Sequence, residues 1–173
     1  MNHGILYSKS KSFTLSSYSD SDYAGDLETR RSTSGNLFFL ANGPISWLSQ
    51  RQPSVSLSTT EAEYISPCTA AREVTWLRRL LSDTGYPCDM GTKLYIDNQS
   101  TIKLIKNPEF HKKTKHIDVQ YHFIREKYER GELDVEFMPS DKQLSDILTK
   151  ALCRPTFELL RGHIVCKRLK EQT

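Results

Sequence analysis

Cysteine is scarce in this sequence. Among 173 residues it occurs only at Cys68, Cys88, Cys153 and Cys166, and no two of these are spaced as C-x-x-C. The spacing typical of zinc ribbons and dithiol redox motifs is therefore lacking. A chain of this length can bury a core without covalent cross-links. We therefore expect free thiols in a reducing compartment.

Long apolar runs are also missing. The longest, residues 37–41, is far too short to span a bilayer. The first residues, 1–6, do not follow the charged and then apolar plan of a secretion signal. We therefore expect a cytoplasmic or nuclear protein, not a secreted one, with no membrane partner.

Charge of one sign does not dominate. The net charge is +3, with 37% hydrophobic and 26% charged residues. This balance is typical of a soluble globular domain and is too even to identify a partner by itself. We expect one domain over residues 13–165, preceded by a polar linker at 1–12 and followed by a tail at 166–173.

The pattern of apolar residues predicts alternating strands and helices. Both tryptophans, Trp47 and Trp76, are expected in the core. Strands are predicted at 13–20, 35–40, 44–51, 93–97 and 133–137, and helices at 60–83, 98–106, 117–129, 141–152 and 155–164. Three strands in a meander followed by alternating elements favour an α/β fold, a mixed sheet with helices on both faces.

Four acids lie where ends of these elements could gather them: Asp20, Glu63, Asp97 and Asp146. Acids at strand ends collect at one edge of an open sheet, where sites in α/β folds form. Two like charges about 4 Å apart repel by roughly 4 kcal/mol at an effective dielectric constant near 20. Divalent cations would relieve that repulsion, and carboxylates suit Mg²⁺ or Mn²⁺. Two such ions could activate water against a phosphodiester.

Each acid also has a purely structural explanation. The first fits a turn and the third fits the cap of the following helix. The second is spaced for a capping box with Thr60. The fourth is spaced for an i,i+4 ion pair with Lys150. Spacing alone leaves both interpretations open.

Six longer motifs cover about residues 15–152. They are YSDSDYAG at 18–25, ISWLSQRQ at 45–52, STTEAEY at 58–64, YIDNQS at 95–100, KHIDVQYHFIRE at 115–126 and QLSDILTK at 143–150. In sequence and in order they resemble motifs of the RNase H domains of copia-type LTR retrotransposon polyproteins.

The resemblance implies the RNase H fold, a mixed five-stranded sheet flanked by helices. It also implies a D-E-D-D site in which Asp20, Glu63, Asp97 and Asp146 hold two Mg²⁺ ions, with Mn²⁺ as a substitute. The implied activity is endonucleolytic hydrolysis of the RNA strand of an RNA–DNA hybrid during reverse transcription. The implied partner is the reverse transcriptase domain of the same polyprotein, in a cytoplasmic virus-like particle or in the nucleus.

Two features depart from the expected pattern. Pro67 lies in the predicted long helix, where it removes a hydrogen bond to the carbonyl of Glu63. It could displace that acid, or the helix could begin later.

The loop at 138–142 has no histidine, although cellular RNases H carry a mobile one there; His116 and His122 are candidates elsewhere. An alternative is therefore a weak or inactive nucleic-acid-binding module, and a further alternative is an integrase or transposase core.

A basic stretch follows the third acid. It could be a solvated charge run, or it could bind the phosphates of the DNA strand without sequence preference. Its members are Lys103, Lys106, His111, Lys112, Lys113, Lys115 and His116.

Overall fold

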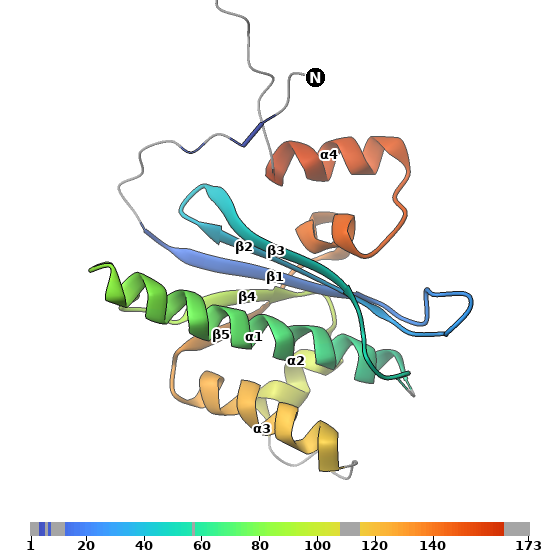
Figure 1. Ribbon diagram of the computed structural model, residues 1–173, viewed down its shortest axis with the longest axis horizontal. Coiled ribbons are helices and arrows are strands. Elements are labelled where there is room, and N and C mark those ends of the chain that lie inside the picture. The colour runs from blue at the N-terminus through green and yellow to red at the C-terminus, as the bar shows by residue number, and fades with distance from the viewer. Residues whose placement is uncertain (1–3, 6, 8–12, 57, 108–114, 165–173) are drawn as a thin grey trace, which may run out of the picture.

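Five strands form one mixed sheet in the order β3-β2-β1-β4-β5 (Figure 1). β1 (Leu15–Asp22), β2 (Thr33–Leu40) and β3 (Gly43–Arg51) form an antiparallel meander. β4 (Thr92–Ile96) pairs with β1 in parallel, and β5 (Leu133–Phe137) pairs with β4 in parallel. The mixed sheet expected from the sequence is confirmed.

The computed structural model describes residues 4–5, 7, 13–56, 58–107 and 115–164, with only the backbone of residues 115–119. The predicted tail at 166–173 lies outside this set, as does most of the predicted linker. Tyr7 donates a hydrogen bond to the carbonyl of Pro44 at 2.5 Å. None of the described helices is long and apolar enough to cross a membrane.

Helices cover both faces of the sheet (Figure 1). α1 (Thr59–Asp83) lies on one face, with α2 (Gln99–Lys106) and α3 (Lys115–Glu129) beside it. On the other face lie a short 3₁₀ helix, η3 (Leu144–Leu148), and α4 (Arg154–Ile164). The sheet is therefore the middle layer of three.

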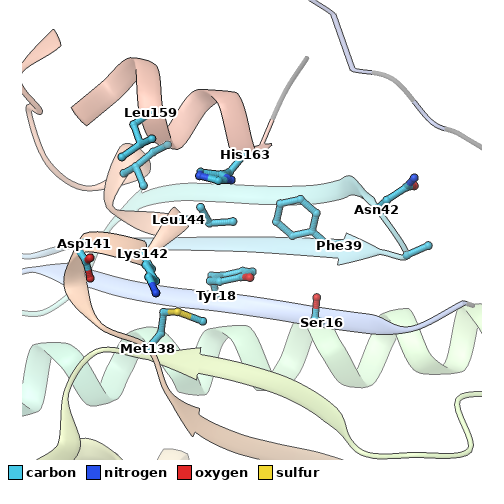
Figure 2. A pocket seen from close by; sticks show the side chains of 12 residues that line it. Ser16, Tyr18, Phe39, Asn42, Met138, Asp141, Lys142, Leu144, Leu159 and His163 are labelled. Atoms are coloured by element: carbon cyan, nitrogen blue, oxygen red, sulfur yellow. The ribbon is translucent and has the colours of Figure 1, made fainter. Parts of the chain in front are cut away.

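β2 shows how the sequence encodes this middle layer. Phe38 packs into the core on the α1 side, whereas Leu37 and Phe39 pack with Leu144 and Leu160 on the α4 side. Figure 2 shows Phe39 and Leu144 between the sheet and α4. Successive side chains of a strand point to opposite faces. An unbroken apolar run is therefore what a strand covered on both faces requires.

α1 begins at Thr59, directly after Ser58, whose side chain accepts a hydrogen bond from the backbone N–H of Glu61. Pro67 lies inside the helix, which continues to Asp83. The alternative of a helix that begins after the proline is therefore wrong.

Cys68 on this helix is a buried free thiol; Cys88 and Cys153 are free as well, and Cys166 lies outside the described residues.

The helix predicted at 141–152 is wrong. Two short 3₁₀ helices occur instead, η2 (Ser140–Lys142) and η3. Gln143 separates them in an extended conformation with φ −73° and ψ 101°. Its buried amide donates to the carbonyls of Ser19 and Tyr95 and accepts from the Ser145 hydroxyl. These bonds to the strands hold the backbone out of α-helical geometry.

The tryptophans are also placed differently from the prediction. Trp47 is 56% exposed and Trp76 is 55% exposed, so neither is a core residue. Trp47 lies on β3, an edge strand with one neighbour. Trp76 lies on α1 two residues after the buried Val74, which turns it about 200° away from that side chain.

Candidate metal centre

Three carboxylates from distant parts of the chain meet beside the central strands. Asp20 lies on β1, Asp97 directly follows β4, and Asp146 lies in η3. One carboxylate oxygen from each lies within 4.8 Å of the other two. β1 and β4 run parallel with Ser19 opposite Ile96. The residues that follow these two, Asp20 and Asp97, therefore lie at the same level along the sheet.

A glycine on β2 allows the third acid to approach. The sequence predicts that β1 ends at Asp20, but the strand continues to Asp22. Asp20 pairs with Gly35 on β2. A Cβ atom at Gly35 would lie 2.5 Å from Cγ2 of Thr149 and 3.0 Å from Cβ of Leu148. Since glycine has no Cβ, η3 packs directly on β2.

Thr149 and Lys150 contact the acids from the end of η3. The Thr149 hydroxyl donates a hydrogen bond to Oδ2 of Asp20. The Lys150 ammonium lies 3.2 Å from Oδ1 of Asp20 and 3.0 Å from Oδ1 of Asp146. The predicted pair between Asp146 and Lys150 therefore forms, but in a partly buried site rather than on a wet helix face.

Glu63 lies beside the three aspartates and is not one of the close group. Its Oε2 accepts a hydrogen bond from Nδ2 of Asn98, whose own Oδ1 caps α2 by accepting from the Thr101 N–H. Burial raises the pKa of Glu63, the Asn98 bond lowers it, and the charges of Asp97 and Asp20 raise it further. The negative charges of Asp97 and Asp20 therefore act on Glu63, the fourth predicted acid, and the Asn98 amide holds its side chain in place.

Burial and mutual repulsion shape the acidity of the cluster. Burial, followed by the charge of Asp20, raises the pKa of Asp146 to about 6, although Lys150 opposes this. The same two causes, in the same order, raise the pKa of Asp97. A site that raises carboxylate pKa values in this way disfavours bare negative charges, so it favours the binding of a proton or a cation.

The raised pKa of Asp146 predicts how metal binding depends on pH. Divalent ions should bind more weakly as the pH falls through about 6. Below that pH a proton must leave before the carboxylate can bind, so affinity should fall about tenfold per pH unit. Isothermal titration with Mn²⁺ between pH 5 and pH 8 measures this, and Asp146→Asn should flatten the profile. An affinity independent of pH in the wild type would contradict the assignment.

The same shift also predicts how the stability of the metal-free protein depends on pH. The dependence is opposite in sign to that of a typical aspartate, whose pKa is lowered by folding. Because the folded pKa of Asp146 is raised, the folded state binds more protons than the unfolded chain. This contribution to stability is present at low pH and is lost as the pH rises from about 4 to about 6.

The donor set fits a hard divalent cation. All three close ligands are carboxylates, and Mg²⁺ and Mn²⁺ prefer such oxygens. The Ser140 hydroxyl donates to Oδ2 of Asp97 at 3.1 Å, which leaves Oδ1 of that side chain for an ion. Ligands oriented by a second layer of hydrogen bonds are common in metal sites.

The predicted nucleic-acid-binding residues are described only in part. Lys103 and Lys106 are exposed on α2, which begins next to the acids. The Lys106 ammonium lies 5.7 Å from the centre of the Tyr128 ring. His111, Lys112 and Lys113 lie outside the described residues, as do the side chains of Lys115 and His116. His122 is exposed on α3.

Sequence reasoning did not find the residues that hold the acids. The sequence does not single out Asn98, Ser140 or Thr149, and it predicts Lys150 only as a partner of Asp146. A signal did exist for three of them, because Asn98 stands beside the third acid and Thr149 and Lys150 closely follow the fourth. Apart from the i,i+4 pair of Lys150 with Asp146, the bonds that these residues make to the acids cross between elements, so spacing does not reveal them.

Comparison with known proteins gives consistent relatives. No protein-family model matches the chain. It is 41% identical over 168 residues to the retrovirus-related Pol polyprotein from transposon RE1 of Arabidopsis thaliana, covering 97% of this chain and 12% of that protein. It is 44% identical over 147 residues to the polyprotein from transposon TNT 1-94 of Nicotiana tabacum, covering 85% of this chain and 11% of that protein. The chain thus spans about a tenth of these relatives.

Solved structures show the same fold at low sequence identity. LC11-RNase H1, solved in complex with an RNA/DNA hybrid, superimposes with a TM-score of 0.58 and 14% identity, covering 79% of this chain and 94% of that chain. Together these comparisons confirm the resemblance carried by the sequence motifs. The chain is homologous to the retrovirus-related Pol polyproteins of copia-type transposons, and its fold is that of an RNase H domain.

Proposed function

We propose that this chain is an endonuclease that hydrolyses the RNA strand of RNA–DNA hybrids with two Mg²⁺ ions. The observation that carries the proposal is the close group of Asp20, Asp97 and Asp146 on an RNase H fold. Such a group is costly in low dielectric without cations. Homology to Pol polyproteins supports the same reaction class.

The chain's own residues supply binding and orientation. Asp20, Asp97 and Asp146 would hold the ions, and Glu63 would complete the set from α1, where Asn98 limits its movement. When bound, the ions supply an activated water and stabilise the leaving oxygen. Thr149 and Ser140 orient Asp20 and Asp97 by hydrogen bonds.

Substrate binding is assigned to the basic face near α2. Lys103 and Lys106 are exposed and lie on the helix that follows Asp97. Contacts of this kind bind phosphates without reading sequence and weaken with salt. Preference for a hybrid would come from groove shape and 2′-hydroxyls. His111, Lys112, Lys113, Lys115 and His116 are proposed to extend this surface.

The setting of the activity is proposed from the relatives. The proteins that match are Pol polyproteins many times longer than this chain. We place the domain after a reverse transcriptase, where it removes copied RNA in the cytoplasm or nucleus.

A cleavage assay tests the proposed reaction. We expect end-labelled RNA to be cut in a hybrid, with Mg²⁺ and not with EDTA, while duplex RNA and duplex DNA stay intact. Cutting should weaken as salt rises, because binding to phosphates releases counterions and added salt opposes that release. Hybrid binding without any product would favour a binding module, and cutting of duplex DNA alone would favour an integrase or transposase core.

A further inference from the structure

The Lys150 side chain places a positive charge between two members of the acidic group. Its ammonium lies 3.2 Å from Oδ1 of Asp20 and 3.0 Å from Oδ1 of Asp146, so it bridges two members of the acidic group. The Asp20 and Asp146 side chains are 2% and 11% exposed. A positive charge this deep among carboxylates acts as an internal counter-ion.

The backbone around Lys150 is fixed while the side chain has a path to solvent. The Thr149 and Lys150 amides both donate to the carbonyl of Asp146, at 3.2 Å and 3.0 Å. The Lys150 side chain is 34% exposed, far more than the acids that it contacts. A flexible four-carbon stem anchored in this way can withdraw toward water without moving η3.

The same short segment contacts both carboxylate oxygens of Asp20. Its Oδ2 accepts from the Thr149 hydroxyl and its Oδ1 faces the Lys150 ammonium. A divalent ion that bound between Asp20 and Asp146 would meet a like charge at the place that it must occupy. The Lys150 ammonium and a divalent ion bound to the same carboxylates would repel each other strongly in a partly buried site.

We propose that Lys150 is a positioning residue that holds the acids together in the metal-free protein and is displaced when a divalent ion binds. This inference rests on the proposed metal centre. It implies that Lys150 stabilises the empty site and at the same time weakens metal binding. An ordinary structural ion pair would do the first and not the second.

Lys150→Met tests both parts, because it keeps the length of the stem and removes the charge. In EDTA the variant should unfold several degrees lower than the wild type, since three carboxylates then repel without a counter-ion. In isothermal titration it should bind Mg²⁺ about tenfold more tightly, since a like charge has been removed. Its midpoint of thermal unfolding should also rise more than that of the wild type on addition of Mg²⁺.

Two further variants separate this role from a general effect of a lost ion pair. Lys150→Arg keeps the charge and should restore the metal-free stability. Arg154→Met removes the exposed i,i+4 pair with Glu158, in which the Arg154 side chain is 87% exposed, and should change neither stability nor Mg²⁺ affinity.

Each outcome bears on the inference. If Lys150→Met binds Mg²⁺ no more tightly than the wild type, or unfolds at the same temperature in EDTA, Lys150 is not a displaced counter-ion. If that happens while the wild type still binds Mg²⁺, the metal centre stands and only this inference fails. If no variant binds Mg²⁺ at all, the metal centre and this inference are both wrong.

Discussion

Asp97→Asn should abolish cleavage of the hybrid. The substitution keeps the size of the side chain and one oxygen for the Ser140 hydroxyl, but removes the charge that a metal ion needs. We expect a loss of at least about a thousandfold, because metal-centred chemistry supplies most of the acceleration in such enzymes. The rate of product formation in Mg²⁺, measured by gel, is the test.

The fold of this variant should remain intact and become more stable without metal. One of three mutually repelling charges is gone, and the charge of Asp20 already raises the pKa of Asp97. A gain of about 1 kcal/mol would raise the unfolding midpoint by about 2–4 °C in EDTA. Loss of activity together with a higher midpoint would separate a site effect from misfolding.

Two matched aspartates serve as controls. Asp22→Asn alters the acid two residues after Asp20, and Asp83→Asn alters an exposed acid at the end of α1. Both should cleave at the wild-type rate. Full activity in Asp97→Asn, or loss of activity in Asp83→Asn, would overturn the assignment of the centre.

Gly35→Ala should damage stability and activity together. The added methyl would lie 2.5 Å from Cγ2 of Thr149 and 3.0 Å from both Cβ of Leu148 and the carbonyl oxygen of Ser145. Two of these atoms belong to the chain of η3 and not to a flexible tip, so the whole segment must shift. Overpacking of this kind costs about 1–3 kcal/mol of unfolding free energy.

The shift should also move Asp146 away from Asp20. A displacement of about 1 Å can cost roughly a hundredfold in rate even when it arises outside the reacting groups. Denaturant unfolding and hybrid cleavage measure the two effects. Mg²⁺ affinity should fall in parallel, because the ligands no longer converge.

Gly162→Ala provides the matched control. A Cβ atom there would meet nothing within 4 Å, and the residue lies in α4. Alanine favours a helix over glycine by about 1 kcal/mol, so this variant should be slightly more stable and fully active. A Gly35→Ala protein that melts and cleaves like the wild type would show that η3 does not depend on this contact.

Much of the secondary structure could be predicted from the sequence because its signals are local. Strict alternation in β5 and the 3.6-residue period in α1 report burial of one face, and the structure has both elements where the pattern places them. The family motifs also marked Asp20, Asp97 and Asp146, which the structure brings together.

The errors arose where a distant contact overrides the local pattern. Residues 141–152 have a helical period, but the bonds from Gln143 to Ser19 and Tyr95 break it into 3₁₀ turns. Trp47 has the hydrophobicity of a core residue, yet it lies on an edge strand and is 56% exposed. Neither outcome is visible in a window of neighbouring residues.

Local patterns were enough to predict the five strands, most of the helices and the identity of the candidate acids, because periodicity and residue chemistry are local properties. The arrangement of those acids follows instead from the tertiary fold. The parallel register of β1 and β4 sets Asp20 beside Asp97, and the missing side chain at Gly35 lets η3 bring Asp146 and Lys150 against them. Such distances depend on pairing between remote segments, which no local pattern specifies.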